Sequence, residues 1–278
     1  MRLGSHVFIS GGLLRAAERA VELGCQSVQI FSGNPRGWRR AGLDSTQAAR
    51  FRALLEQHGI RPLFVHVPYL ANAAAQDELL WRRSVELITH DLARAVELGA
   101  AALVLHVGSS TAPAREAEGR VAAALAEALE RVGAGRILLE NTAGQGAQIG
   151  FELDQVARIM DRVTDAVGGR VGACLDVAHA FEAGYDIGTA AGLEEALTLL
   201  GPERVGLIHL NDSKTGRGSR VDRHWHLGEG RIGEEGLRRV LTHPGLRALP
   251  AVMETPKEPP GSDERNMATA RRLAGMGQ

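Results

Sequence analysis

The sequence predicts an α/β protein built as a single (β/α)8 barrel, and three observations support this fold class. Short apolar runs typical of strands alternate with longer runs of helical periodicity along the chain. Most of the short runs end in a histidine or a carboxylate, as expected where parallel strands open onto one active-site face. The 278 residues, 44% of them hydrophobic, can bury one barrel core. We therefore expect one domain, residues 1–278, with its active site at the C-terminal face of the strands.

Eight runs have the length and composition of buried strands. They cover residues 4–10, 27–31, 62–67, 102–107, 137–140, 171–176, 205–211 and 251–254. A doubly wound open sheet is the structural alternative. Such a sheet would not bring side chains from six strands to one place, so the closed barrel is the better interpretation.

The segments between these strands have helical features. The clearest helices are predicted over residues 13–23, 46–58, 78–98 and 116–132. Glycines of the kind that cap helix C-termini follow them, at Gly24, Gly59, Gly99 and Gly133. Four long segments without predicted secondary structure also follow strands, at residues 32–44, 68–77, 141–150 and 213–234. Long loops in this position form the active face of a barrel.

Composition limits the possible functions. The net charge of -1 and the pI near 6.8 do not suggest a general nucleic-acid binder, which is usually basic. Cys25 and Cys174 both lie in apolar stretches, so we expect buried, reduced thiols and a cytoplasmic protein. No signal pattern opens the sequence, and no apolar run approaches the ~18 residues of a membrane span. We expect no membrane partner.

Nine side chains at or just beyond strand ends are candidate metal ligands. They are His66, His106, Glu140, Asp176, His179, His209, Asp222, His224 and Glu254. A single histidine at a strand end is usually a satisfied polar core residue, but here the same context recurs. Nine nitrogen and oxygen ligands are too many for one tetrahedral zinc and suit a cluster. A nitrogen-rich set favours zinc over magnesium or calcium.

Local spacing supports several of these assignments. Asp176 and His179 are three apart, so both face the mouth if the strand turns just after Asp176. Asp222 and His224 are two apart and point the same way on an extended segment. Glu254, like Glu140, ends an apolar strand, where an unpaired buried carboxylate would be costly.

The remaining histidines have simpler interpretations. His58, His90 and His243 lie in or at the ends of predicted helices, so we expect surface or capping roles. His6 lies on the first strand and could support a ligand from behind. His226 is close to the cluster in sequence, but we leave it out of the ligand set.

Two other classes of function stay open at this point. Glu140, Asp176, His209 and Glu254 alone resemble the single-metal site of sugar isomerases and epimerases on this barrel. The other five candidate ligands are not needed for that chemistry. A non-catalytic binding protein is a further alternative, although a disused site would be expected to lose ligands.

Several motifs together resemble the endonuclease IV family of apurinic/apyrimidinic-site nucleases, which have the xylose isomerase-like TIM barrel. They are SHV, FVHVPYL, LHVG, LLENTAGQG, CLDVAHAF, HLNDSK, SRVDRHWHLGEG and METPK. The resemblance covers essentially the whole chain, and VDRH with LGEG and CLDVAH is a specific combination. Gly37 and the pair Trp225–His226 depart from the family's pattern, which affects fine DNA contacts rather than the reaction.

The resemblance implies a cluster of three zinc ions. The first would be held by His66, His106 and Glu140. The second would share Glu140 as a bridge and add Asp176, His209 and Glu254. The third would be held by His179, Asp222 and His224. Among these ligands we assign the catalytic carboxylates as Glu140 and Glu254.

The resemblance also implies the reaction. The expected enzyme is a zinc-dependent DNA-repair hydrolase that cuts the phosphodiester 5′ to an abasic site, leaving a 3′-hydroxyl and a 5′-deoxyribose phosphate. It would also trim blocked 3′ ends. The partner would be double-stranded DNA containing abasic sites, and we expect a cytoplasmic, nucleoid-associated monomer.

The expected DNA contacts lie in the loops after the second, third and seventh strands. They are Arg36, Trp38, Tyr69, Leu70, Lys214 and Arg223. Further basic residues, Arg39, Arg40, Arg217 and Arg220, lie in the same loops. Three divalent ions would over-neutralise the four carboxylate ligands, so the mouth would be locally positive and could hold phosphates. The simpler alternatives are solvated basic side chains and aromatic rings packed on the barrel rim.

Overall fold

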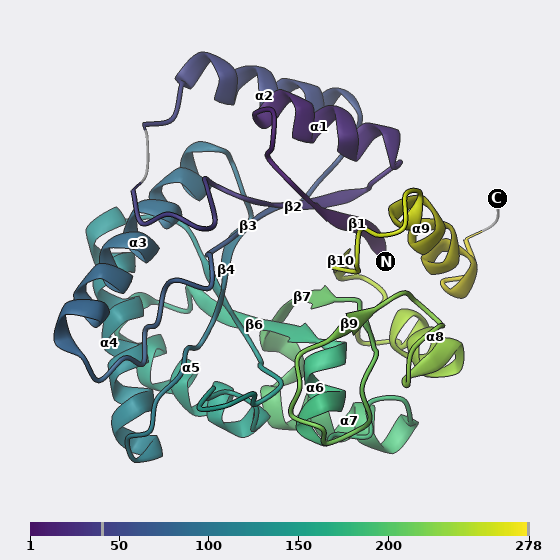
Figure 1. The fold of residues 1–278 in the computed structure, drawn as a ribbon. Coiled ribbons are helices and arrows are strands. Elements are labelled where there is room, and N and C mark those ends of the chain that lie inside the picture. The colour runs from purple at the N-terminus through teal and green to yellow at the C-terminus, as the bar shows by residue number, and fades with distance from the viewer. Residues whose placement is uncertain (40–41, 277–278) are drawn as a thin grey trace.

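In the computed structural model, which describes residues 1–39 and 42–276 apart from the side chains of 164–166, parallel strands close into a barrel (Figure 1). The strands are β1 (Arg2–Val7), β2 (Ser27–Phe31), β3 (Leu63–His66), β4 (Ala102–His106), β5 (Ile137–Glu140), β6 (Val171–Asp176), β7 (Val205–His209) and β10 (Pro250–Met253). β10 pairs with both β1 and β7, which closes the sheet. The predicted barrel is confirmed, and closure excludes the open doubly wound sheet.

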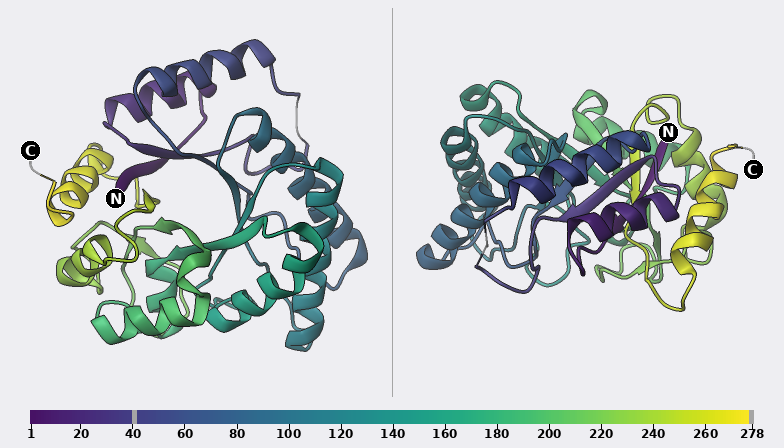
Figure 2. Two further views of the ribbon diagram at one scale, coloured as in Figure 1. Left: turned by 180° about the vertical axis from the view of Figure 1, so that it is seen from behind. Right: turned by 90° about the horizontal axis from the view of Figure 1, so that it is seen from above.

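Helices surround the barrel on its outer side, as the views in Figure 2 also show. They are α1 (Leu13–Glu22), α2 (Ser45–Gln57), α3 (Glu78–Glu97), α4 (Ala114–Val132), α5 (Leu153–Val167), α7 (Ala190–Leu200), α8 (Gly233–Thr242) and α9 (Ser262–Leu273). A short helix, α6 (Val177–Ala183), follows β6 without a gap, and a 3-10 turn (Pro202–Arg204) precedes β7. Within the described residues, no helix is both long and apolar enough to cross a membrane.

Two strands end two or more residues earlier than the sequence prediction, and other boundaries shift by one or two residues. β1 ends at Val7 and not at residue 10, because the Gly12 amide donates to the Ile9 carbonyl at 2.9 Å and closes a turn. β7 ends at His209 and not at residue 211. Beyond it the chain leaves the barrel and pairs β8 (Asp212–Ser213) with β9 (His224–Trp225) in an antiparallel ribbon. The segment 213–234, expected to lack regular structure, therefore contains a hairpin whose strands are too short to show a period.

The inside of the barrel is filled by a small apolar layer. It contains Phe64, Ala102, Val104, Leu138, Cys174, Leu207 and Val252. Because side chains alternate along a strand, the residue two positions further on points to the same side. That position is His66 after Phe64 and Glu140 after Leu138, and the other four strands of this layer follow the same rule. The strand period thus places six candidate ligands directly above the inner core.

Candidate metal centre

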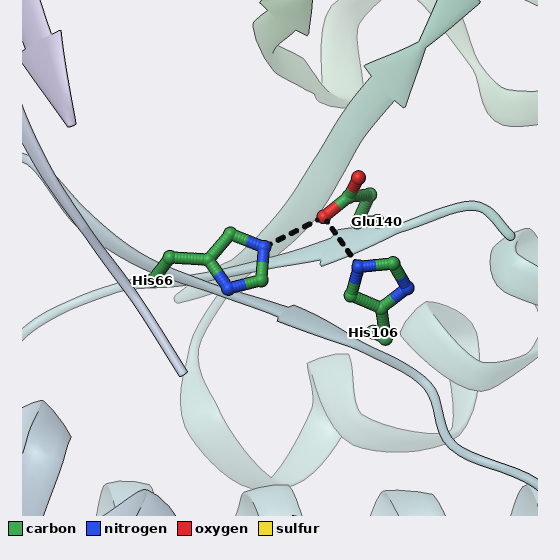
Figure 3. Close-up of side chains that lie close together, drawn as sticks. All are labelled: His66, His106 and Glu140. Carbon is green, nitrogen blue, oxygen red and sulfur yellow. Dashed lines mark hydrogen bonds and ion pairs between the residues drawn. The ribbon is translucent and has the colours of Figure 1, made fainter. Parts of the chain in front are cut away.

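The first group of side chains consists of His66, His106 and Glu140, at the ends of β3, β4 and β5 (Figure 3). Both imidazoles face one carboxylate oxygen. His66 Nε2 lies 2.8 Å from Glu140 Oε2, and His106 Nε2 lies 3.3 Å from the same oxygen. Among the described residues, neither ring nitrogen of His106 has a hydrogen-bond partner although both are buried. Burial lowers the pKa of His106 to about 4, so this imidazole is neutral and can act as a ligand.

The second group is centred on His209. Its Nε2–H donates to Gln29 Oε1 at 3.0 Å, which leaves Nδ1 as the free acceptor nitrogen. Nδ1 faces carboxylate oxygens at 3.0 Å from Glu140, 3.3 Å from Glu254 and 3.8 Å from Asp176. A lone pair directed at three carboxylates is repulsive unless a cation or a proton lies between them. The potential ligand atoms of these four residues all lie within 4.8 Å of one another.

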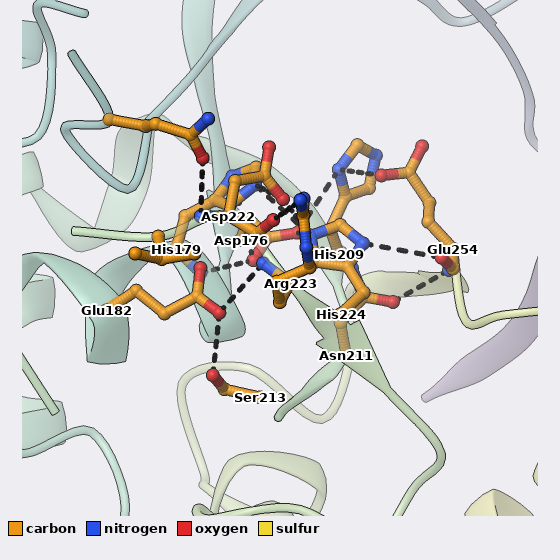
Figure 4. A network of polar contacts seen from close by, with 12 residues as sticks. Asp176, His179, Glu182, His209, Asn211, Ser213, Asp222, Arg223, His224 and Glu254 are labelled. Atoms are coloured by element: carbon orange, nitrogen blue, oxygen red, sulfur yellow. Dashed lines mark hydrogen bonds and ion pairs between the residues drawn. The ribbon is translucent and has the colours of Figure 1, made fainter. Parts of the chain in front are cut away.

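The third group joins the start of α6 to the loop after β8 (Figure 4). His179 Nε2 and His224 Nε2 are 3.1 Å apart, and Asp222 Oδ1 lies 3.4 Å from the former and 3.8 Å from the latter. The other nitrogens of these rings donate to main-chain carbonyls, His179 Nδ1 to Asn141 and His224 Nδ1 to Glu254. Two acceptor nitrogens therefore face each other, an arrangement that a shared metal ion would stabilise.

Asp176 belongs to two of the groups. Its side chain lies within ligand distance of His209 and also of His224, where Asp176 Oδ2 is 3.5 Å from Nε2. The other oxygen accepts the His179 amide at 2.7 Å and caps α6. The turn that sequence spacing required after Asp176 is thus made by the helix itself, since β6 ends at Asp176 and α6 begins at Val177.

Electrostatics in this mouth are dominated by burial and by the imidazoles. Burial would raise the pKa of the Glu140 carboxyl, but the surrounding histidines, among them His179 and His209, hold that pKa well below its usual range. Burial would likewise lower the pKa of the His66 imidazole, and the Glu140 carboxylate raises it overall. The Glu140 carboxyl is therefore ionised, which is the state that a metal requires.

Sequence reasoning missed three amides that hold the ligands. Gln29 Nε2 donates to Glu254 Oε1 at 2.6 Å, in addition to the bond with His209. Asn141 accepts the Asp176 amide at 2.8 Å, and Asn211 Nδ2 donates to Asp176 Oδ2 at 2.8 Å. The available signal was a polar side chain in an apolar strand for Gln29. Asn141 immediately follows Glu140, and Asn211 lies two residues beyond His209.

The histidines outside the predicted ligand set contact other side chains or lie in or at the ends of helices. His6 Nδ1 lies 3.1 Å from Glu254 Oε1, behind the second group. His226 is buried and its Nδ1 contacts Asn266 Nδ2 at 3.1 Å, away from the ligand atoms. His90 lies within α3, and His58 and His243 are the C-cap residues of α2 and α8.

The loop residues predicted to contact DNA lie in different environments. Tyr69 is 65% exposed, and its ring centroid is 5.0 Å from that of His106, so an aromatic surface borders the first group. Leu70 is half-buried beside it. Arg36 and Trp38 are exposed on the loop after β2.

The basic residues of the mouth divide into two kinds. Lys214 Nζ lies 4.0 Å from the centroid of the Trp225 ring, and Arg223 is exposed. Arg217, by contrast, pairs with Asp186 Oδ2 at 2.8 Å, and Arg220 lies over the Phe151 ring. Arg39 is exposed, and Arg40 lies outside the described residues.

Comparison with known proteins places this geometry among relatives. The family described as "Xylose isomerase-like TIM barrel" matches residues 17–274. "Probable endonuclease 4" of Methanoculleus marisnigri is 44% identical and covers 98% of this chain and 99% of its own. The protein of the same name from Methanosphaerula palustris is 42% identical, with coverages of 99% and 98%.

Solved structures give the same picture. Endonuclease IV from Thermus thermophilus superposes with a TM-score of 0.89 at 37% identity, covering 100% of both chains. A D-tagatose 3-epimerase-like protein superposes with a TM-score of 0.72 at 19% identity, covering 99% of this chain and 98% of its own. The second likeness shows a shared barrel fold and no more.

Proposed function

Because this chain belongs to the endonuclease IV family of xylose isomerase-like TIM barrels, we propose that it is a zinc-dependent DNA-repair endonuclease. The bond that it hydrolyses is the phosphodiester 5′ to an abasic site, and the products are a 3′-hydroxyl and a 5′-deoxyribose phosphate. The observation that carries this proposal is the convergence of three ligand groups in one barrel mouth.

The donor set fits three zinc ions. His66, His106 and Glu140 would hold one, and Glu140, Asp176, His209 and Glu254 would hold a second. His179, Asp222 and His224 would hold the third, with Asp176 close enough to contribute. Imidazole nitrogens make up five of the nine donors, a mixture that suits zinc. When bound, such ions lower the pKa of a water and polarise phosphoryl oxygens for hydrolysis.

The residues of the chain hold these donors in place before any substrate arrives. Glu140 presents Oε2 to the first group and Oε1 to the second, which suits a bridging carboxylate. Glu254 has Oε1 occupied by Gln29, so Oε2 is directed toward His209. These contacts support catalytic roles for Glu140 and Glu254, because side chains held from behind lose little freedom when they act.

DNA contacts are proposed on both sides of the mouth. Tyr69 and Leu70 border the first ligand group and would insert into the duplex where a base is missing. The missing base lowers the free energy needed to separate the neighbouring stacked bases. Arg36 and Trp38 would fill or stack against the same gap. Lys214 and Arg223 would contact phosphates, because both are exposed and neither pairs with a carboxylate within the described residues, whereas Arg217 pairs with Asp186.

We extend the proposal to the wider behaviour of the protein. The chain would act as one catalytic domain, residues 1–278, and as a monomer in the cytoplasm, where it would work on nucleoid DNA. The same ligand groups would also remove blocked 3′ ends, because that reaction breaks the same kind of bond. A single-metal sugar isomerase would need the second group only, and would leave His66, His106 and the third group without a role.

The test is incision of a duplex oligonucleotide that carries one stable abasic-site analogue, with purified protein and no added magnesium. We expect a cut on the 5′ side whose 3′ end a polymerase can extend, and about three zinc ions per chain. His224→Ala should abolish incision, whereas His90→Ala, on the outer helix α3, should not. Zinc-loaded protein that binds one metal and leaves the duplex intact would favour the isomerase.

A further inference from the structure

Two of the proposed ligands lie neither at the end of a barrel strand nor in the helix that follows β6. Asp222 and His224 are carried by the ligand loop, which we define as residues 213–233; it runs from the last residue of β8, through β9, to the first residue of α8. The other ligands lie at the ends of barrel strands or in α6. A loop of this length needs an anchor of its own if its side chains are to meet His179.

A buried carboxylate at the start of the ligand loop provides that anchor. Asp212 is fully buried, and its two oxygens accept main-chain N–H groups instead of a salt-bridge partner. The donors are Ser213 at 2.8 Å, Gly228, Gly230 and Ile232 at 3.0 Å, and Gly233 at 3.4 Å. One side chain therefore holds the far end of the loop against its beginning.

The contacts with Asp212 also explain the glycines of the LGEG sequence, which contains none of the proposed ligands. A Cβ atom at Gly230 would lie 2.4 Å from Asp212 Oδ1 and 2.4 Å from the Ser213 carbonyl oxygen, so no side chain fits there. Gly228 has a φ of +83°, which favours glycine at that position as well. The two glycines of the LGEG sequence thus allow the main chain to approach the Asp212 carboxylate. We call this carboxylate and the main-chain N–H groups that donate to it the Asp212 cradle.

The near half of the loop is tied to α6. Glu182, in the last turn of that helix, accepts the Ser213 hydroxyl at 2.6 Å and the Arg223 amide at 3.1 Å. The Lys214 amide donates to the Arg223 carbonyl at 2.9 Å. His179 lies in the first turn of the same helix, so one short helix and one loop assemble the third ligand group.

We propose that Asp212 is a positioning residue: its carboxylate closes the ligand loop so that Asp222 and His224 reach His179. The inference rests on the proposed function, in which these three residues hold one of the metal ions. Asp212 contacts no substrate in this role. Its loss releases the loop, while the ligands at the strand ends keep their places, so the metal ion of the third group is lost selectively.

Two variants disrupt the Asp212 cradle, one at its acceptor and one at its main-chain donors. Asp212→Ala removes the acceptor, and Gly230→Ala forces a methyl group into it. Asp212→Asn keeps one acceptor oxygen and should give an intermediate result. Gly216→Ala is the matched control, because a Cβ at this glycine of the same loop would meet nothing within 4 Å. Glu118→Ala controls for general loss of stability, since it removes another buried carboxylate, on α4.

Zinc per chain, measured by mass spectrometry after gel filtration, is the first readout. We expect the two cradle variants to retain about two of three zinc ions, and both controls to retain all three. The second readout is the rate of tryptic cleavage at the exposed arginines of the loop in metal-free protein. This rate should be about tenfold higher in the cradle variants than in the parent protein.

The outcomes separate the two proposals. Full zinc content and unchanged proteolysis in both cradle variants would overturn the positioning role, even if the parent protein incises DNA. A parent protein that neither binds zinc nor incises would overturn the proposed function instead. Faster loop cleavage would then still support Asp212 as the anchor of the loop.

Discussion

At the scale of single residues, several proposed ligands have one atom held by the protein and another left for the metal. His209 donates from Nε2 to Gln29, and His179 donates from Nδ1 to the Asn141 carbonyl. This division fixes which nitrogen carries the hydrogen and which can bind. It also leaves the acceptor nitrogens of His179 and His224 facing each other 3.1 Å apart.

A residue-scale prediction concerns Tyr69. Tyr69→Ala should raise the KM for duplex containing an abasic site by about tenfold and leave zinc content unchanged, because a stacking ring contributes about 1–3 kcal/mol. Tyr69→Phe, which keeps the ring, should stay close to the parent protein. Steady-state incision kinetics with metal analysis checks both.

Leu79→Ala is the control for that experiment. Leu79 is 64% exposed, about as much as Tyr69, but it lies on the outer helix α3. Equal losses of affinity in the two alanine variants would show that Tyr69 has no specific contact with DNA.

At the scale of elements, buried and exposed ion pairs join neighbouring helices of the outer ring. Glu118 on α4 is buried and accepts from Arg158 at 3.0 Å and from Arg162 at 3.2 Å, both on α5. Glu86 on α3 meets Arg131 of α4 in a similar way but is exposed. Glu118 and Glu86 therefore allow a buried and an exposed carboxylate–arginine contact to be compared.

We predict that Glu118→Ala lowers the free energy of unfolding by about 2 kcal/mol, because two hydrogen bonds to a buried charged group are lost. Glu86→Ala should lower it by less than about 1 kcal/mol, since its pair is screened by water. Urea denaturation of both variants measures the difference. Equal effects would mean that burial does not strengthen the α4–α5 contact.

At the scale of the whole molecule, one end of the barrel buries a cluster of titratable groups above an apolar inner layer. Glu140, Asp176, His179 and His209 are almost completely buried in the mouth. Ionised carboxylates at such depth repel one another unless cations compensate them. The stability of the fold should therefore depend on the occupancy of the mouth.

Removal of metal by a chelator should lower Tm by about 10 °C, because ligand binding near 1,000 times Kd contributes about 4 kcal/mol and 1 kcal/mol shifts Tm by a few degrees at this size. Added zinc should restore the value. Differential scanning calorimetry before and after chelation is the measurement, and an unchanged Tm would contradict a buried metal centre.

Thiol reactivity tests the same packing at other positions. Burial raises the pKa of Cys25 to about 11 and that of Cys174 to about 12, so neither thiol is ionised near neutral pH. The native protein should not react with a thiol reagent at pH 8, and both cysteines should react in guanidinium chloride. Rapid labelling of the native chain would show that one of these regions opens.

The sequence alone determined the barrel and the positions of the ligand candidates on its strands, because both depend on local periods. Alternation along β3 or β5 places His66 or Glu140 on the inner side whatever the rest of the chain does. Only the tertiary structure decided what surrounds them. Gln29 contacts His209 and Glu254, which are far from it in the chain, and Asp212 accepts from amides 16 to 21 residues away. Such contacts leave no period in the sequence, since a buried polar side chain looks the same locally whichever partner satisfies it.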